Sequence, residues 1–236
     1  AAFVRRIDRL PLPVRSAPGF LVNRILLPYL LEAVQLLQEG VPPAIVDRAA
    51  TGFGMPVGPV RLADQVGLDI CLAVAEKLQP GHGEPLPALL REKVEAGELG
   101  RKSGTGFYRY DDRGRPLGGG GGRGPVDAEL ADRMIYRLLN ESLACLREGL
   151  VADADLLDAG VVFGTGFAPF RGGPLRHIRE TGPRRCRQRL AELERQHGER
   201  FRADAGWDLL SPPDTARQSM AAGDLPPPGH RPAFHL

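Results

Sequence analysis

The apolar positions of this chain recur mostly at helical spacing, which predicts an all-α protein. In the stretch 20–38, apolar side chains fall three or four residues apart, at Leu27, Leu30, Val34 and Leu37. A second long helix is expected at 127–147, where the stripe runs through Tyr136, Leu139, Leu143 and Leu146. Further helices are expected at 43–51, 59–78, 86–96, 153–162, 173–180 and 183–196, and the end of another at 3–9.

The remaining stretches lack this spacing. Two prolines favour extended backbone at 12–15. Residues 104–110 alternate aromatic and polar side chains after glycines, so they are expected to be extended. Five consecutive glycines at 118–122 predict a flexible linker, and the proline-rich tail from Ser211 predicts irregular structure.

One pattern occurs twice in the chain. Its markers return 109 residues later, with Glu32, Glu39 and Gly40 repeated as Glu141, Glu148 and Gly149. The pair Gly52 and Gly54 returns as Gly164 and Gly166 after a short insertion. Self-similarity of this kind indicates one structural unit used twice. We therefore predict two similar helical lobes packed face to face as a pseudo-dimer, since apolar stripes this long need more cover than one lobe offers.

Composition and charge narrow the function classes. The 236 residues are 42% hydrophobic and 25% charged, as in ordinary globular proteins, and the net charge of +2 gives no general attraction to nucleic acid. No apolar run approaches the roughly 20 residues of a membrane helix. Three widely spaced cysteines and the lack of an apolar signal segment favour reduced thiols and a cytoplasmic location. Because the chain lacks a starting methionine, we expect it to be a piece of a longer protein.

Short motifs add little chemistry. The Gly52–Gly54 and Gly164–Gly166 pairs lack the third glycine and the preceding strand of a dinucleotide fingerprint, so we interpret them as turns. The five histidines are scattered, and no spacing typical of metal ligands is present. An arginine cluster at 184–189, followed by glutamates, is interpreted as a solvated helix face.

Asn23 is the one polar residue whose place in the pattern is unusual. It precedes Leu27 by four residues, which predicts that it lies on the same face as the apolar stripe. Asparagine is a poor helix former, and its amide is costly to bury without partners. Spacing alone leaves two readings open: a cap for the first turn of the helix, or a polar group at a site shared with another domain.

Several long, ordered motifs resemble the C-terminal domain of 3-hydroxyacyl-CoA dehydrogenase. They are Pro18-Gly19-Phe20-Leu21-Val22-Asn23-Arg24, Gly52-Phe53-Gly54-Met55-Pro56-x-Gly58-Pro59, Leu62-Ala63-Asp64-x-x-Gly67-Leu68-Asp69 and Lys102-x-Gly104-x-Gly106-Phe107-Tyr108. The second copy, with Asn140-Glu141, Glu148-Gly149 and the segment 164–173, resembles the tandem copy of multifunctional fatty-acid oxidation proteins.

The resemblance implies an all-α fold of the 6-phosphogluconate dehydrogenase C-terminal-domain type. It further implies a remnant of a Rossmann domain at 1–17, a first helical copy at 18–112, a Gly-rich linker at 113–126, and a second copy with its tail at 127–236. The activity implied is NAD-dependent oxidation of (S)-3-hydroxyacyl-CoA in fatty-acid β-oxidation. NAD and the catalytic histidine belong to a Rossmann domain that this chain lacks, and the implied partners are that domain, a hydratase domain and a thiolase subunit.

By the same resemblance, Asn23 matches the asparagine that the helical domain contributes to the substrate site. Phe163 stands where the family's second copy often carries a substrate-contacting tyrosine, so its ring lines the acyl-CoA passage without a hydroxyl to donate. The alternative left open is a free-standing, non-catalytic helical module that binds acyl-CoA or a partner protein.

Overall fold

The computed structural model describes residues 11–78, 85–117 and 126–210. The helix end expected at 3–9, the glycine run at 118–122 and the tail from Ser211 lie outside these residues. Within them the protein is almost entirely helical, as predicted. The principal helices are α2 (Val22–Gln38), α3 (Pro43–Phe53), α4 (Pro59–Val66), α5 (Leu68–Leu78), α6 (Ala88–Glu95), α7 (Ala128–Arg147), α8 (Ala154–Thr165), α9 (Pro174–Thr181) and α10 (Pro183–His197).

Shorter elements complete the fold. Short 3-10 helices lie at Arg101–Ser103 (η1), Pro169–Arg171 (η2), Glu199–Phe201 (η3) and Ala205–Leu210 (η4). The expected extended segment at 104–110 is a strand only at β1 (Arg109–Tyr110), which pairs antiparallel with β2 (Pro116–Leu117). Asp64 holds this segment against α4, since its carboxylate accepts hydrogen bonds from the backbone N–H groups of Phe107 and Tyr108, both at 2.9 Å.

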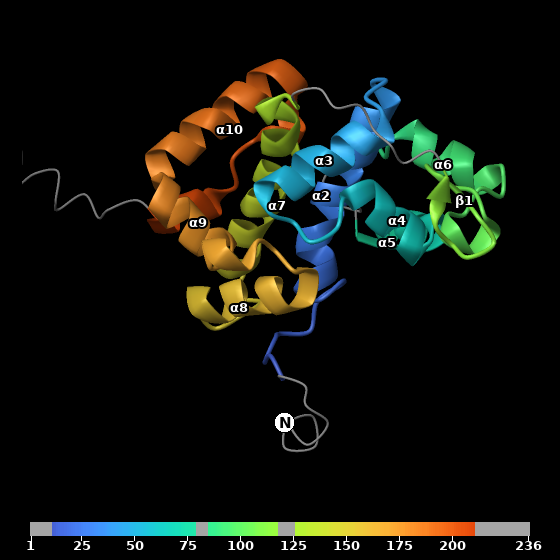
Figure 1. Ribbon diagram of the computed structural model, residues 1–236. Helices are drawn as coiled ribbons and strands as arrows, with labels where there is room; N and C mark the ends of the chain where they lie inside the picture. The colour runs from blue at the N-terminus through green and yellow to red at the C-terminus, as the bar shows by residue number, and fades with distance from the viewer. Residues whose placement is uncertain (1–10, 79–84, 118–125, 211–236) are drawn as a thin grey trace, which may run out of the picture.

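The two long helices, α2 and α7, lie against each other at the centre of the molecule (Figure 1). One hydrophobic core spans both, joining Ile25, Tyr29 and Leu36 to Leu139 and Leu143. The first half of the described chain (11–117) and the second half (126–210) therefore bury each other's apolar side chains in one large core, and the first half also has a smaller core of its own.

The apolar stripe predicted for α2 was only partly right. Leu27 and Val34 are buried in a smaller second core against α5 and α6, whereas Leu30 and Leu37 are only partly buried. The side chains that face α7 are a different row, which includes Ile25 and Tyr29. Because α2 lies between α7 on one side and the α4–α6 group on the other, it is apolar on two faces, and a single-stripe pattern cannot describe it.

The single helix expected at 59–78 is also wrong. The backbone of Gly67 has φ of +104°, which ends α4 before α5 begins. Gly182 has a φ of +97° at the corresponding break between α9 and α10. Residues other than glycine rarely adopt such a positive φ. Glycine at each position therefore permits a sharp change of direction between two helices.

A buried aspartate fixes the start of one helix in each half. Asp47 on α3 accepts a hydrogen bond from the Val60 N–H at 2.8 Å, at the start of α4. Asp158 on α8 accepts from the N–H groups of Leu175 and Arg176 at 2.7 and 2.9 Å, at the start of α9. Both helices begin with a proline, so each aspartate satisfies N–H groups that have no partner within the helix.

Two further expectations concern cysteines and membranes. Cys71, Cys145 and Cys186 are all buried and free of disulfides. Among the described helices, none is both long and apolar enough to cross a bilayer.

Candidate functional site

Asn23 lies in the first turn of α2, where the chain enters the helix through a tight turn. The Phe20 N–H donates to the Ala17 carbonyl at 2.9 Å, and both Gly19 and Phe20 have positive φ. Leu21 is the N-cap residue, and no side chain caps this helix. Asn23 is exposed, and its amide makes no hydrogen bond to any other residue that the structure describes. Its side chain therefore neither caps the helix nor joins the buried face that the spacing predicted.

The residues on either side of Asn23 are both anchored to the second half. Val22 lies over Gly164 of α8 so closely that a Cβ atom on Gly164 would be 2.5 Å from Val22 Cγ2. Arg24 donates from Nε to Glu141 at 2.7 Å and from its two terminal nitrogens to Glu148 at 2.5 and 2.9 Å. Asn23 is thus an exposed amide between two fixed neighbours.

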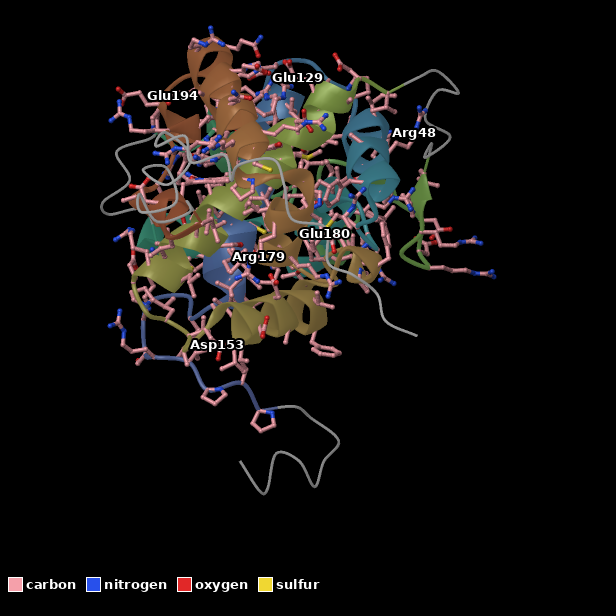
Figure 2. The ribbon with its side chains drawn as sticks, turned by 90° about the vertical axis from the view of Figure 1, so that its left-hand side faces the viewer. Arg48, Glu129, Asp153, Arg179, Glu180 and Glu194 are labelled. Atoms are coloured by element: carbon pink, nitrogen blue, oxygen red, sulfur yellow. The ribbon has the colours of Figure 1, made fainter. Side chains whose placement is uncertain are left out.

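Phe163, the other predicted site residue, lies on α8 with 74% of its surface exposed. It lines a groove of about 570 Å³ between α8 and α9, together with Arg179 and Glu180. In Figure 2 these two residues lie above α8, whose N-cap residue Asp153 is labelled below them. Asn23 does not line this groove. Its neighbour Val22, however, is in contact with Gly164, the neighbour of Phe163, so the two predicted site residues flank one contact between α2 and α8.

Arg133 makes an equivalent set of ion pairs in the opposite direction, from the second half to the first. Arg133 on α7 donates from Nε to Glu32 at 2.7 Å and from its terminal nitrogens to Glu39 at 2.6 and 2.8 Å. Each half therefore supplies one arginine and receives the other half's arginine between two glutamates. We call these two sets the Arg24 clamp (Arg24, Glu141, Glu148) and the Arg133 clamp (Arg133, Glu32, Glu39).

Sequence reasoning used the glutamates only as repeat markers and missed the clamps. A signal was present, because Arg24 and Arg133 are separated by the same 109 residues as Glu32 and Glu141 or Glu39 and Glu148. An arginine and two glutamates that recur at one offset in both halves favour a reciprocal contact, as in an isologous interface.

The ion pairs shift the pKa values of Arg24, Glu148, Glu39 and Arg133. The hydrogen bond from Arg24 lowers the pKa of Glu148, and the same bond is the main reason that the pKa of Arg24 is raised. The hydrogen bond from Arg133 lowers the pKa of Glu39. Burial disfavours the charge of Arg133, but its hydrogen bonds to Glu39 and Glu32 outweigh that effect and raise its pKa. All of these groups are therefore charged near neutral pH.

A larger cavity of about 710 Å³ borders the Arg24 clamp. It lies between α2, α7 and the η3–η4 segment, and both charged and apolar side chains line it. Its charged groups pair with one another, as Arg147 does with Asp204 at 2.8 Å. The side-chain oxygen Oδ1 of Asn140 accepts from the Asp204 N–H and from the Trp207 indole, at 2.9 and 2.8 Å, and so ties η4 to α7.

Neither a dinucleotide-binding βαβ unit nor a cluster of metal ligands is found among the described residues. Their only strands are the short antiparallel pair β1 and β2, so they offer no parallel strand followed by a glycine-rich turn and a helix, as a dinucleotide requires. Within the same residues, no three His, Cys, Asp or Glu side chains gather as metal ligands.

We compared the chain with protein families and with known proteins. Residues 19–110 match the family model of the 3-hydroxyacyl-CoA dehydrogenase C-terminal domain. The chain is 36% identical over 212 residues to the fatty acid oxidation complex subunit alpha of Shewanella loihica, covering 85% of this chain and 30% of that protein.

Two solved structures share the fold. The 3-hydroxybutyryl-CoA dehydrogenase of Escherichia coli K12 superposes with a TM-score of 0.72 at 20% identity, over 89% of this chain and 63% of its own. The dehydrogenase part of multifunctional enzyme 1 from C. elegans gives 0.63 at 22% identity, over 88% and 51%. The family match covers the motif around Asn23, the break at Gly67 and the segment held by Asp64. Residues 19–110 therefore form a domain of the 3-hydroxyacyl-CoA dehydrogenase C-terminal-domain family.

Proposed function

We propose that this chain is the C-terminal part of an NAD-dependent 3-hydroxyacyl-CoA dehydrogenase that oxidises (S)-3-hydroxyacyl-CoA to 3-oxoacyl-CoA in fatty-acid β-oxidation. The family match and the name of the Shewanella relative support this assignment. The chain spans 30% of that relative's length, which leaves room for a Rossmann domain that binds NAD and for a hydratase domain. A thiolase subunit is the expected partner of the whole protein.

The observation that carries the proposal is the state of Asn23. An exposed amide in the first turn of a helix, with both neighbours fixed and no partner among the described residues, is available to hydrogen-bond a ligand. We assign this amide to the substrate site, where it holds an oxygen of the acyl-CoA. The exposed ring of Phe163 lines the passage of the acyl chain.

We further propose that the two halves are two copies of one fold, packed as a pseudo-dimer. The reciprocal clamps, the common core around α2 and α7, and the matching aspartates Asp47 and Asp158 support this interpretation. On this view the chain contains within itself the contact that single-copy relatives make between subunits.

The test uses the full-length protein that carries this chain, with NADH formation as the assay. Asn23→Ala should lower kcat by about 100-fold or more, the usual effect of losing a hydrogen bond that tightens in the transition state, with little change in Tm. Gln188→Ala removes another exposed amide, on α10, and should leave both values unchanged. The chain of 236 residues alone should form no NADH.

Full turnover by the Asn23→Ala variant would contradict the role of this residue. If the full-length protein binds acyl-CoA but forms no NADH with any 3-hydroxyacyl-CoA, the non-catalytic module is the better description.

A further inference from the structure

We propose that the second half positions Asn23 for the reaction, with Glu148 and Glu141 acting through Arg24 and Gly164 acting through Val22. This inference rests on the proposed function of Asn23 and adds the residues that aim its amide. They are positioning residues, since they contact the neighbours of Asn23 and not the substrate.

Local interactions do little to stabilise the turn that leads into α2. Phe20 has a φ of +49°, which is unfavourable for a residue with a bulky side chain. The N-cap residue Leu21 offers no polar side chain to the free N–H groups of the first turn. The position of this turn therefore depends on contacts from outside the helix.

The second half supplies these contacts along the whole approach to Asn23. The Arg15 N–H donates to the Leu150 carbonyl at 2.8 Å, and the Arg15 guanidinium donates to the Glu148 carbonyl at 2.5 Å. Leu21 lies over Gly160 of α8, where a Cβ atom would be 2.8 Å from Leu21 Cδ2. Val22 and Arg24 follow, on Gly164 and on the Arg24 clamp. All of these contacts come from the α7–α8 region, while Leu78 of α5, in the first half, lies against Gly19 of the turn.

The residues that precede the two clamp arginines differ between the halves. The residue 109 positions after Asn23 is Asp132, whose carboxylate accepts from Arg189 at 2.7 Å. The second half therefore retains the arginine, Arg133, but has a carboxylate bound to an arginine where the first half has a free amide. The second half thus keeps the arginine contact but has no free amide beside it, as expected if its role is to support the amide of the first half.

The same symmetry provides a matched control. Glu148 and Glu39 are equivalent glutamates, with 31% and 36% of their side chains exposed, and each binds its arginine through both oxygens. Glu39, however, follows the last turn of α2, about 24 Å along the helix axis from Asn23. Both substitutions by glutamine should therefore weaken the fold similarly, but only one should move Asn23.

The experiment compares Glu148→Gln and Glu39→Gln in the full-length protein, each with and without Asn23→Ala. Glu148→Gln should lower kcat about tenfold or more, because small displacements of a positioned group cost that much. In the Asn23→Ala background it should lower kcat no further. Glu39→Gln should change kcat less than twofold in both backgrounds, despite a similar loss of Tm. If Glu148→Gln leaves kcat unchanged, or lowers it equally with and without Asn23, the positioning role is wrong.

A second pair keeps the test decisive if Glu148→Gln fails to fold. Gly164→Ala places a methyl group against Val22, whereas Gly52→Ala, at the equivalent place on α3, points into open space. Gly164→Ala should lower kcat at least tenfold only when Asn23 is present, and Gly52→Ala should not; equal effects would overturn the proposal. If Asn23→Ala alone has no effect on kcat, the proposed function of Asn23 fails instead, and the two failures are therefore distinct.

Discussion

Substitution of Glu32 tests the most deeply buried part of the interface between the two halves. The Glu32 side chain is 1% exposed, and its carboxylate accepts from Arg133 at 2.7 Å and from Arg200 at 2.8 Å. Arg133 is itself only 4% exposed. Glu32→Gln keeps the shape of the side chain but removes the charge between two guanidinium groups.

The expected loss follows from this burial. Removing one partner of a buried ion pair costs about 3–5 kcal/mol, because the other charge stays buried and uncompensated. Arg133 keeps its bonds to Glu39, and glutamine can still accept one hydrogen bond, so we expect about 3 kcal/mol, at the lower end of that range. Two controls, at glutamates that are more exposed, test whether the loss of stability depends on burial. Glu141→Gln, at the equivalent place but 13% exposed and with one arginine partner, should cost about 1.5 kcal/mol.

The second control is Glu76→Gln, which removes the exposed pair with Arg91 and should cost at most about 1 kcal/mol. Urea unfolding of the 236-residue chain measures all three, and the free energies are comparable if the slope with denaturant is unchanged. The order Glu32, Glu141, Glu76 is the prediction. A Glu32→Gln variant that loses no more than Glu76→Gln would refute the argument, because burial would then not set the cost.

Two further substitutions address buried groups. His177 packs edge-on against Phe53 at 5.3 Å, and its pKa is lowered from 6.5 by burial and by the nearby charge of Arg171, with Glu180 opposing. At this site the unfolded chain therefore binds more protons than the folded chain. The free energy of unfolding should be highest above about pH 6.5 and should fall as the pH drops through that value toward the lower pKa of the folded state, whereas His177→Phe should lose less. Urea midpoints at about pH 7 and pH 5 test this, and an equal change of midpoint in the two proteins would contradict it. The Tyr29 hydroxyl is buried without a partner among the described residues, so Tyr29→Phe should leave the free energy of unfolding unchanged or raise it by about 1 kcal/mol; a loss above about 1 kcal/mol would show that the hydroxyl is bonded.

Local patterns predicted most of the helices but not which of their faces are buried. Proline at the start and glycine at the end of several helices act within a few residues, so their bounds could be predicted closely. The break at Gly67 was missed because apolar residues continue at helical spacing across it. The two buried faces of α2 depend on which helices flank it, and spacing within α2 carries no information about its neighbours.

The candidate site was predictable only in part. The family motif identified Asn23, but its exposed state arises because α2 is covered by α7 on one side and by α5 and α6 on the other. The strained turn at Gly19 and Phe20 has a visible glycine, yet nothing in the sequence indicates that Phe20 also has positive φ. The clamps join residues more than 100 positions apart, and only the common offset of the repeat could have revealed them.

The clamps also explain why charged residues lie in an interface that is otherwise apolar. Buried ion pairs add little net stability compared with well-packed apolar side chains, so stability alone does not account for them. Leucine-rich faces of two helices tolerate a slip of one turn, about 5.4 Å, since one apolar contact replaces another. Glu32 on α2 and its C-cap residue Glu39, two turns later, hold Arg133 between them. Glu141 on α7 and its C-cap residue Glu148 hold Arg24 in the same way. A slip of one turn would break the two-oxygen contacts of both arginines together. The clamps therefore fix the register of α2 against α7, and the position of Asn23 follows from that register.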